Sequence, residues 1–361
     1  MPDFPNLVKH FSFEGDFLDA VSYGTGHINE TYAARFQQPD GTTRRYILQQ
    51  INTQIFKAPE KVMRNIQKVT SHLRRKLGGQ ERAVVTLVPT TDGESFYVTP
   101  SGEFWRAEVF IEGAQTYLTA RDSQHYYNAA RAFGEFQKYL DDFPIHELHD
   151  TIPDFHHTGK RFDAFLRAVE RDAVNRTAQV KREIDFVLQR ADEATVLTDM
   201  VEKGQMPLRV THNDTKLDNV MIDDVTGEGV CVIDLDTVMP GFAVFDFGDT
   251  VRSCANTGLE DEPDLSKVNF DLSVFDRLAH GFLDATREIL TPAEIDQLAF
   301  GAKLITFEQG IRFLTDYLNG DTYYKIHRPS HNLDRARTQL KLVQKMEQSY
   351  DAMLATIERY R

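Results

Sequence analysis

A short β-rich stretch, residues 208–237, most constrains the fold of this chain, because helical patterns flank it on both sides. The stretch predicts a strand, a loop, a second strand, a turn and a third strand. The loop carries Asp214 and Asn219, and Asp234 follows the third strand. Because the turn at 223–227 pairs the last two strands, all three side chains are expected to meet at one end of a small antiparallel sheet.

These three side chains suit a phosphoryl transfer. Asp214 can accept the proton of an attacking hydroxyl, while Asn219 and Asp234 can hold a metal ion on nucleotide phosphates. Mg²⁺ prefers oxygen ligands and retains waters, so one carboxylate, one amide and phosphate oxygens suffice. A single Asp or Asn at such a position usually caps a turn. All three in one strand–loop–strand context favour phosphoryl transfer.

Other polar residues near this loop have more than one interpretation. Lys216 can meet the transferred phosphoryl oxygens as a point charge or stay solvated on the loop. We expect His212 to brace the loop, since one proton acceptor is enough. Asp246 is expected to be a buried acceptor that braces the same loop. Asp249 then faces the substrate cleft or, alternatively, caps a helix.

The first hundred residues predict a small antiparallel α+β lobe. Val62, Ile66 and Val69 follow helical spacing, which predicts a helix over 58–76. Gly24 and Gly26 lie in the turn between the first two strands. Glycines in a turn often supply only a positive φ, but ahead of the catalytic loop they are expected to cover nucleotide phosphates. The predicted strands span 17–23, 28–36, 42–50, 83–88, 95–99 and 104–111.

From residue 113 onward helices dominate, so we expect two lobes with a cleft between them. The nucleotide-binding lobe is predicted to span 1–112, and the catalytic and substrate-binding lobe 113–361. Thr291 and Glu294 form a capping box around Pro292, which predicts a helix start. Other helices are predicted at 119–140, 161–171, 183–190, around 275–283, and in one long final stretch over 333–357.

Composition excludes several classes of function. Lys and Arg total 41 against 55 Asp and Glu, and the net charge of −14 argues against nucleic acid or anionic membranes as partners. The 361 residues hold two cysteines, too few for a disulfide scaffold. Neither a long apolar run nor a signal-peptide pattern is present. We therefore expect a soluble cytoplasmic protein that acts as a monomer.

With these residues in place, the chain resembles the protein-kinase-like small-molecule kinases, the aminoglycoside phosphotransferase and choline kinase group. Within that group it is most similar to the N-acetylhexosamine 1-kinases. Residues 23–32, 46–52, 211–219, 233–237 and 310–318 carry the likeness. The resemblance implies a bilobal kinase-like fold. It also implies transfer of the γ-phosphoryl group of ATP, with Mg²⁺, to the anomeric hydroxyl of N-acetylglucosamine or N-acetylgalactosamine.

The resemblance also implies roles for individual residues. It makes Asp214 the base, aided by Lys216, and makes Asn219 and Asp234 the metal ligands. The sugar contacts it implies are Asp214 and four more, His27, Asn213, Arg312 and Tyr323. The nucleotide contacts it implies are Gly24, Gly26, Gln49, Phe110 and Glu112, the last two through the backbone between the lobes.

One position departs from the broader kinase pattern. The third strand of such kinases presents a lysine to the nucleotide phosphates, but this chain has Gln49 there. The partner glutamate on the next helix is missing too, since Arg64 and Asn65 occupy that region. More neutralisation must then come from Mg²⁺, from loop amides or from another basic residue such as Arg64. The narrower sugar-kinase pattern is expected to lack the lysine as well.

Two other functions remain open. A kinase of an aminoglycoside, choline or another amino alcohol would use carboxylates, and the net charge and the acidic run at 260–264 favour it, although such a run is usually solvated. His27, Arg312 and Tyr323 instead favour a neutral sugar. Gln49 suggests a non-catalytic nucleotide-binding scaffold, but the three residues for phosphoryl transfer are all present.

Overall fold

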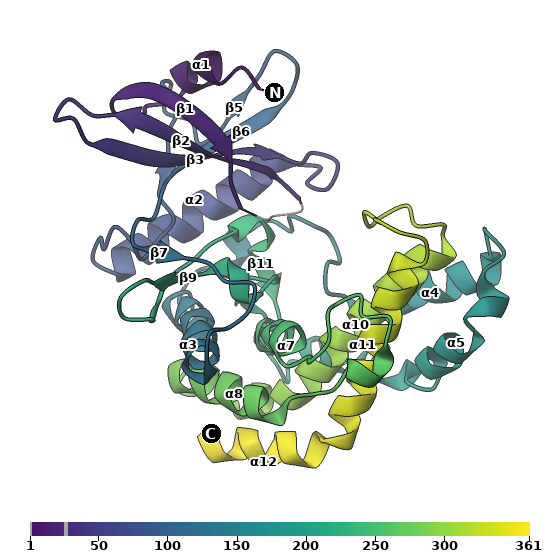
Figure 1. The fold of residues 1–361 in the computed structure, drawn as a ribbon. Helices are drawn as coiled ribbons and strands as arrows, with labels where there is room; N and C mark the ends of the chain where they lie inside the picture. The colour runs from purple at the N-terminus through teal and green to yellow at the C-terminus, as the bar shows by residue number, and fades with distance from the viewer. Residues whose placement is uncertain (1, 25–27) are drawn as a thin grey trace.

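The computed structural model describes residues 2–24 and 28–361. It has two lobes, a small one built around a β-sheet and a larger one that is mainly helical (Figure 1). This arrangement confirms the predicted α+β class and the bilobal architecture.

The small lobe contains an antiparallel sheet in the order β1-β2-β3-β6-β4, with β5 also paired to β6. Because side chains alternate along a strand, Tyr46 and Leu48 enter the core of this lobe, while Ile47 and Gln49 face the large lobe. The sheet strands are β1 (Asp16–Ser22), β2 (Glu30–Gln37), β3 (Thr43–Ile51), β4 (Leu87–Val88), β5 (Tyr97–Val98) and β6 (Phe104–Val109).

Helix α2 (Pro59–Lys76) joins the two lobes through a shared core. Its buried stripe includes Val62 and Ile66, as the spacing predicts. The stripe packs in one hydrophobic cluster with residues of α3 (Ser123–Tyr139), β9 (Val220–Asp223) and β10 (Gly229–Val232), all from the large lobe. The small lobe is therefore anchored on the strands that carry the catalytic loop.

The large lobe surrounds its short strands with helices. β9 pairs with β10 and with β7 (Ala114–Gln115), and β8 (Arg209–Thr211) pairs with β11 (Met239–Gly241). Helix α7 (Ala243–Cys254) lies behind these strands and packs on α10. The other helices are α4 (Thr158–Arg171), α5 (Lys181–Leu188), α6 (Val196–Glu202), α8 (Leu272–Thr286), α9 (Pro292–Asp296), α10 (Leu298–Leu318), α11 (His331–Gln348) and α12 (Tyr350–Tyr360).

The capping box at Thr291 and Glu294 is confirmed, but the helix it starts is short and α10 follows directly. The prediction of one final helix over 333–357 is wrong at Ser349, which leaves helical geometry (φ −106°, ψ 8°). The chain bends there, so that α12 runs beneath α8 (Figure 1). The predicted strands at 83–88 and 95–99 are also shorter, with two residues each.

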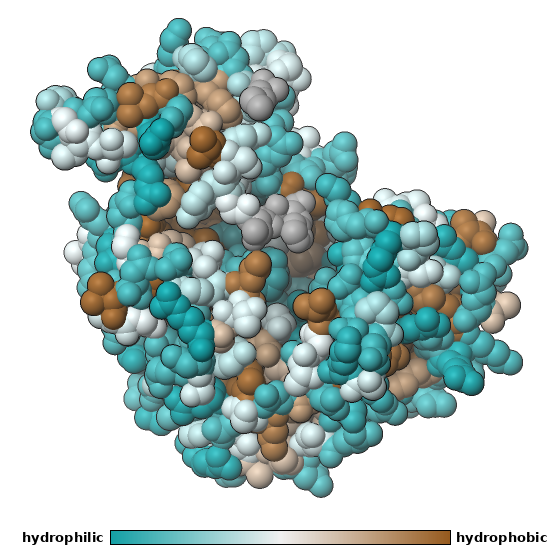
Figure 2. All heavy atoms as spheres, in the orientation of Figure 1, coloured by the Kyte–Doolittle hydropathy of each residue, from teal (hydrophilic) through white to brown (hydrophobic). Residues whose placement is uncertain are grey.

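The molecular surface is mixed. On the face shown in Figure 2, hydrophobic residues form scattered patches among hydrophilic ones. Within residues 2–24 and 28–361, none of the helices combines the length and the apolar character that crossing a bilayer requires.

Candidate active site

A cavity of about 220 Å³ lies between the lobes and is lined by both of them. We call it the interlobe cavity. From the small lobe it receives Ile47, Gln49, Glu108, Phe110 and Ile111, among others. From the large lobe it receives Asp214, Lys216, Asn219, Asp234 and Asp236. The structure therefore brings the predicted base, lysine and metal ligands to one space.

The catalytic loop holds Asp214 in place. The Nδ2 of Asn219 donates to the main-chain O of Asp214 at 2.7 Å and to its Oδ2 at 3.2 Å. Lys216 Nζ lies 3.2 Å from the same Oδ2, and Asp214 is the main reason that the pKa of Lys216 is raised. Of the two interpretations of Lys216, the structure favours the inward-facing one, because its side chain lines the interlobe cavity.

Asp246 braces the catalytic loop, as predicted. Its Oδ2 accepts the N–H of His212 at 2.9 Å and its Oδ1 accepts the N–H of Asn213 at 2.8 Å. The carboxylate is buried on α7, and burial raises its pKa. His212 Nε2 donates to Ile233 O at 2.8 Å, so this ring links the loop to β10 and is a bracing residue rather than a reactive one.

Asn213 is a structural part of the loop. Its φ is +65°, and its buried Nδ2 donates to Thr237 O at 2.9 Å. Its Oδ1 accepts from Thr211 Oγ1 at 3.0 Å. A Cβ on the neighbouring Gly241 would lie 2.8 Å from this Oδ1, so only glycine fits. The amide thus has protein partners at both its nitrogen and its oxygen, and the expected sugar contact of Asn213 stays a prediction.

A divalent cation fits the pair formed by Asn219 and Asp234. Burial is the main cause that raises the pKa of Asp234, and the charges of Asp236 and Asp214 raise it further. A cation here would relieve this repulsion between carboxylates. The described part of the chain holds no group of three or more His, Cys, Asp or Glu side chains that could bind a metal alone. The ion would therefore complete its coordination with phosphate oxygens and water, as Mg²⁺ does on nucleotides.

The small lobe places some of the predicted nucleotide contacts at the cavity. Gly24 (φ +80°) lines it, as do Gln49 and Phe110. Glu112 is not in the lining, and its Oε1 accepts from Arg45 Nε at 2.8 Å. Gly26 and His27 lie outside the described residues, so their predicted roles stay predictions.

Arg106, a residue of the site that the sequence motifs did not predict, is 1% exposed on β6. Arg106 Nε donates to Gln49 Oε1 at 2.9 Å, and its guanidinium pairs with Asp236. Arg64, the alternative cation suggested above, is exposed on α2. The available signal for Arg106 was that it is the single basic residue of an otherwise apolar and acidic strand, residues 104–109.

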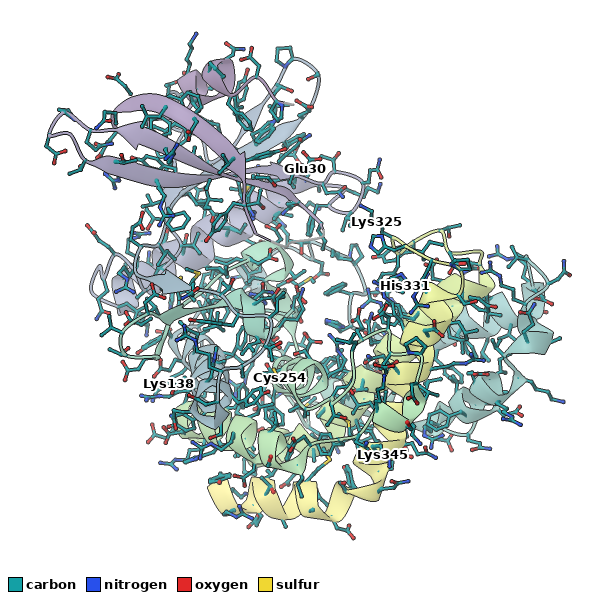
Figure 3. All side chains as sticks on the ribbon, viewed as in Figure 1. Glu30, Lys138, Cys254, Lys325, His331 and Lys345 are labelled. Carbon is teal, nitrogen blue, oxygen red and sulfur yellow. The ribbon has the colours of Figure 1, made fainter. Side chains whose placement is uncertain are left out.

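Arg312 and Tyr323 lie together on a second wall, outside the lining of the interlobe cavity. Asp316, near the end of α10, accepts the N–H groups of Tyr323 at 2.8 Å and Tyr324 at 2.9 Å. These bonds hold the 319–330 loop. Figure 3 labels Lys325 on this loop and His331, the first residue of α11.

We call this second wall the acceptor wall, formed by Phe155, Arg161, Arg312, Tyr323 and Tyr324. The Arg312 guanidinium lies 5.1 Å from the Phe155 ring centre and 5.8 Å from that of Tyr324. Burial and then the charge of Arg312 lower the pKa of Arg161.

A hydrogen-bonded chain connects the acceptor wall to the catalytic loop. Glu308, one turn before Arg312 on α10, accepts from His156 Nδ1 at 2.8 Å and from Thr158 Oγ1 at 2.6 Å. His156 Nε2 donates to Asn213 O at 2.9 Å, next to the base. Asp249 is not a cap, since it lies within α7 and pairs with Arg252 at 2.8 Å.

Comparisons with known proteins agree with this geometry. An aminoglycoside phosphotransferase from Alicyclobacillus acidocaldarius is 13% identical, with a TM-score of 0.63 over 99% of this chain and 98% of that one. A microcompartment-associated aminopropanol kinase is 16% identical, with a TM-score of 0.59 over 97% of each chain. Amicoumacin kinase, solved with AMP-PNP and Ca²⁺, is 13% identical, with a TM-score of 0.61 over 95% of this chain and 92% of that one. At these identities the likeness shows a shared fold.

The family match is more specific than the structural likeness. The model of the phosphotransferase enzyme family matches residues 20–283, which is more than half of the chain and includes Asp214, Asn219, Asp234 and the small-lobe strands from β2 onward. The chain therefore belongs to the phosphotransferase enzyme family.

Proposed function

We propose that this phosphotransferase transfers the γ-phosphoryl group of ATP to the anomeric hydroxyl of an N-acetylhexosamine, giving the sugar 1-phosphate. In this proposal ATP occupies the interlobe cavity with its adenine near Phe110 and Ile111. Asn219 and Asp234 hold the Mg²⁺, which when bound neutralises charge on the phosphates. Asp214 orients the acceptor hydroxyl and accepts its proton, and Lys216 offsets charge on the transferred group.

The observation that carries the choice of acceptor is the charge of the acceptor wall. Arg161 and Arg312 lie close together and form no ion pair among the described residues, and Arg161 Nε is buried without a partner there. The nearest carboxylate on α10, Glu308, is already bound to His156 and Thr158. Two guanidinium groups repel a cationic acceptor, whereas their N–H donors suit the carbonyl and hydroxyl oxygens of an acetamido sugar.

One observation favours the second candidate, a kinase of an amino alcohol or aminoglycoside. Asp249 is buried, and its Oδ2 has no hydrogen-bond partner in the part of the chain that the structure describes. Such an oxygen could accept from an ammonium group. The names of the aminopropanol kinase and the aminoglycoside phosphotransferase agree with this alternative. Against it, Arg252 already supplies a positive charge to Asp249.

A panel of acceptors separates the two candidates. Release of ADP is measured with Mg²⁺, ATP and, at equal concentration, N-acetylglucosamine, N-acetylgalactosamine, choline, ethanolamine, aminopropanol or kanamycin. We expect the two acetamido sugars to exceed every cationic acceptor in kcat/KM by at least ~100-fold, since each unmatched polar contact costs about 1–3 kcal/mol. Faster turnover of any cationic acceptor would refute the proposal.

A variant of the acceptor wall provides the structural arm of the test. Arg312→Gln should raise the KM for the sugar about tenfold or more while leaving the KM for ATP unchanged, because it removes charge from the acceptor wall alone. Arg359→Gln is the matched control, since Arg359 is exposed on α12 and pairs with Asp276 of α8. Equal sugar KM values in both variants would remove Arg312 from the acceptor site.

A further inference from the structure

Asp236, two residues after the metal ligand Asp234, is held by the small lobe from two directions. Its Oδ2 accepts from Asn29 Nδ2 at 2.5 Å, and its Oδ1 pairs with Arg106. Asn29 lies just before β2, at the end of the glycine-rich turn, whereas Arg106 lies on β6. Asp236 is 2% exposed and Arg106 is 1% exposed, so solvent screens neither charge.

Gln49 fixes the orientation of Arg106. The two residues face each other across the β3–β6 ladder. Gln49 Oε1 accepts from Arg106 Nε at 2.9 Å, and Gln49 Nε2 donates to Thr31 Oγ1 at 3.0 Å. Glu108 Oε1 also lies 3.2 Å from Arg106 Nε. The guanidinium therefore has one neutral and one acidic partner on its own sheet, and its Nη1 donates to Asp236.

Asn65 on α2 holds the same segment of the large lobe from another side. Its Nδ2 donates to Val238 O at 2.9 Å and to His149 O at 2.8 Å, and its Oδ1 accepts the N–H of His149 at 2.9 Å. Gln49 and Asn65 occupy the regions where the broader kinase pattern has a lysine and a glutamate. Asn65 reaches residues 235–238 directly, through Val238 O, whereas Gln49 reaches them only through Arg106, which pairs with Asp236.

We propose that the Arg106–Asp236 ion pair replaces the missing lysine–glutamate pair and positions Asp234 and Asn29 for MgATP. Arg106 is a positioning residue, because it acts on the nucleotide site through Asp236. The pair joins β6 of the small lobe, Asn29 just before β2 and the segment that bears Asp234. Its charge also offsets the carboxylates of Asp234 and Asp236. The inference rests on the proposed function only in taking the interlobe cavity as the MgATP site.

Binding of Mg²⁺ with AMP-PNP, measured by calorimetry without any acceptor, tests the pair directly. Arg106→Gln and Asp236→Asn should each weaken binding at least ~10-fold, since each strands a buried charge. The double variant should bind no more weakly than the worse single variant, because the two residues act as one unit. Arg106→Lys should recover part of the affinity. Arg35→Gln is the matched control, because Arg35 pairs with Asp19 on exposed strands of the same lobe.

A purely structural role predicts a different pattern. Thermal unfolding would shift, yet the folded variants would bind Mg-AMP-PNP as the wild type does at low temperature, and that result would overturn the inference. Asn29→Ala removes the hydrogen bond to Asp236 and the one from the N–H of Asn52, but it strands no charge, so it remains informative if the charge variants do not fold. It should weaken binding several-fold, and unchanged affinity there would also refute the role of Asp236. A wild-type protein that binds no Mg-AMP-PNP would overturn the proposed function together with this inference.

Discussion

Asp214 is restrained on several sides before any substrate arrives. Asn219 donates to both its main-chain oxygen and its carboxylate, and Lys216 lies 3.2 Å from that carboxylate. Asp246 holds the N–H groups of the two preceding residues. Such restraints keep a carboxylate in one orientation, which phosphoryl transfer needs more than it needs a strong base.

Replacing this carboxylate separates catalysis from nucleotide binding. Asp214→Asn keeps the shape of the side chain but removes the proton acceptor, so kcat should fall at least ~10²-fold while ATP affinity changes little. Turnover and calorimetric binding of Mg-AMP-PNP provide the two measurements. Asp224→Asn, on the exposed β9–β10 turn, is the control with normal turnover. A near-normal kcat for Asp214→Asn would remove Asp214 from its assigned role.

The two thiols offer a residue-level test of burial. Burial raises the pKa of Cys231 and of Cys254 to about 12. At about pH 8 the thiolate fraction is then about one in ten thousand, and the thiolate is the reactive form. Iodoacetamide should therefore leave the buried Cys231 unlabelled in the native protein, label the half-buried Cys254 more slowly than a free thiol, and label both in urea, as followed by mass spectrometry. Labelling of native Cys231 at the rate of a free thiol would contradict the buried environment.

Sequence distance explains which site residues could be predicted. Asp214, Asn219 and Asp234 lie within about twenty residues, and the loop and hairpin between them determine their separation. Arg106 and Asn29 meet Asp236 from 130 and 207 residues away, and no local pattern marks them as its partners. The sugar contact expected of Asn213 stays a prediction, and its hydrogen bonds to Thr211 and Thr237 are likewise not visible in the sequence pattern.

Helical periodicity predicts single helices well, but it predicts the bends between helices poorly. The stripe of α2 and the capping box at Thr291 both depend on a few neighbouring residues, and both are present. The apolar pattern over 333–357 continues across Ser349, because α11 and α12 each bury one face. Helical spacing alone therefore cannot reveal that the chain turns there to cover α8.

The packing of α3 against α8 depends on glycine. A Cβ on Gly281 of α8 would lie 2.2 Å from the main-chain O of Tyr127 on α3, and backbone cannot move aside cheaply. Gly281→Ala should therefore lower the free energy of unfolding by about 1–3 kcal/mol. Urea unfolding measures this change. Arg287→Ala, at the exposed C-terminal end of α8, should stay within about 0.5 kcal/mol of wild type. A neutral Gly281→Ala would contradict the close approach.

At the scale of the whole molecule, two of the contacts between the lobes bear most directly on the site. One is the hydrophobic cluster that α2 shares with α3, β9 and β10. The other is the buried contact of Asp236 with Arg106 and Asn29. Together they position the nucleotide cavity over the catalytic loop, while the acceptor wall on α4, α10 and the 319–330 loop lies to one side. Under the proposed function, the choice of acceptor therefore belongs to the large lobe.

The most direct test of the proposed reaction is the site at which phosphate is added. The protein is incubated with MgATP and either N-acetylglucosamine, its methyl glycoside, or its 6-deoxy analogue, and the products are analysed by mass spectrometry. We expect one phosphate on the free sugar and on the 6-deoxy analogue, and none on the methyl glycoside, whose anomeric oxygen is capped. A phosphorylated methyl glycoside, or an unmodified 6-deoxy sugar, would show that the acceptor is another hydroxyl and would contradict the proposed reaction.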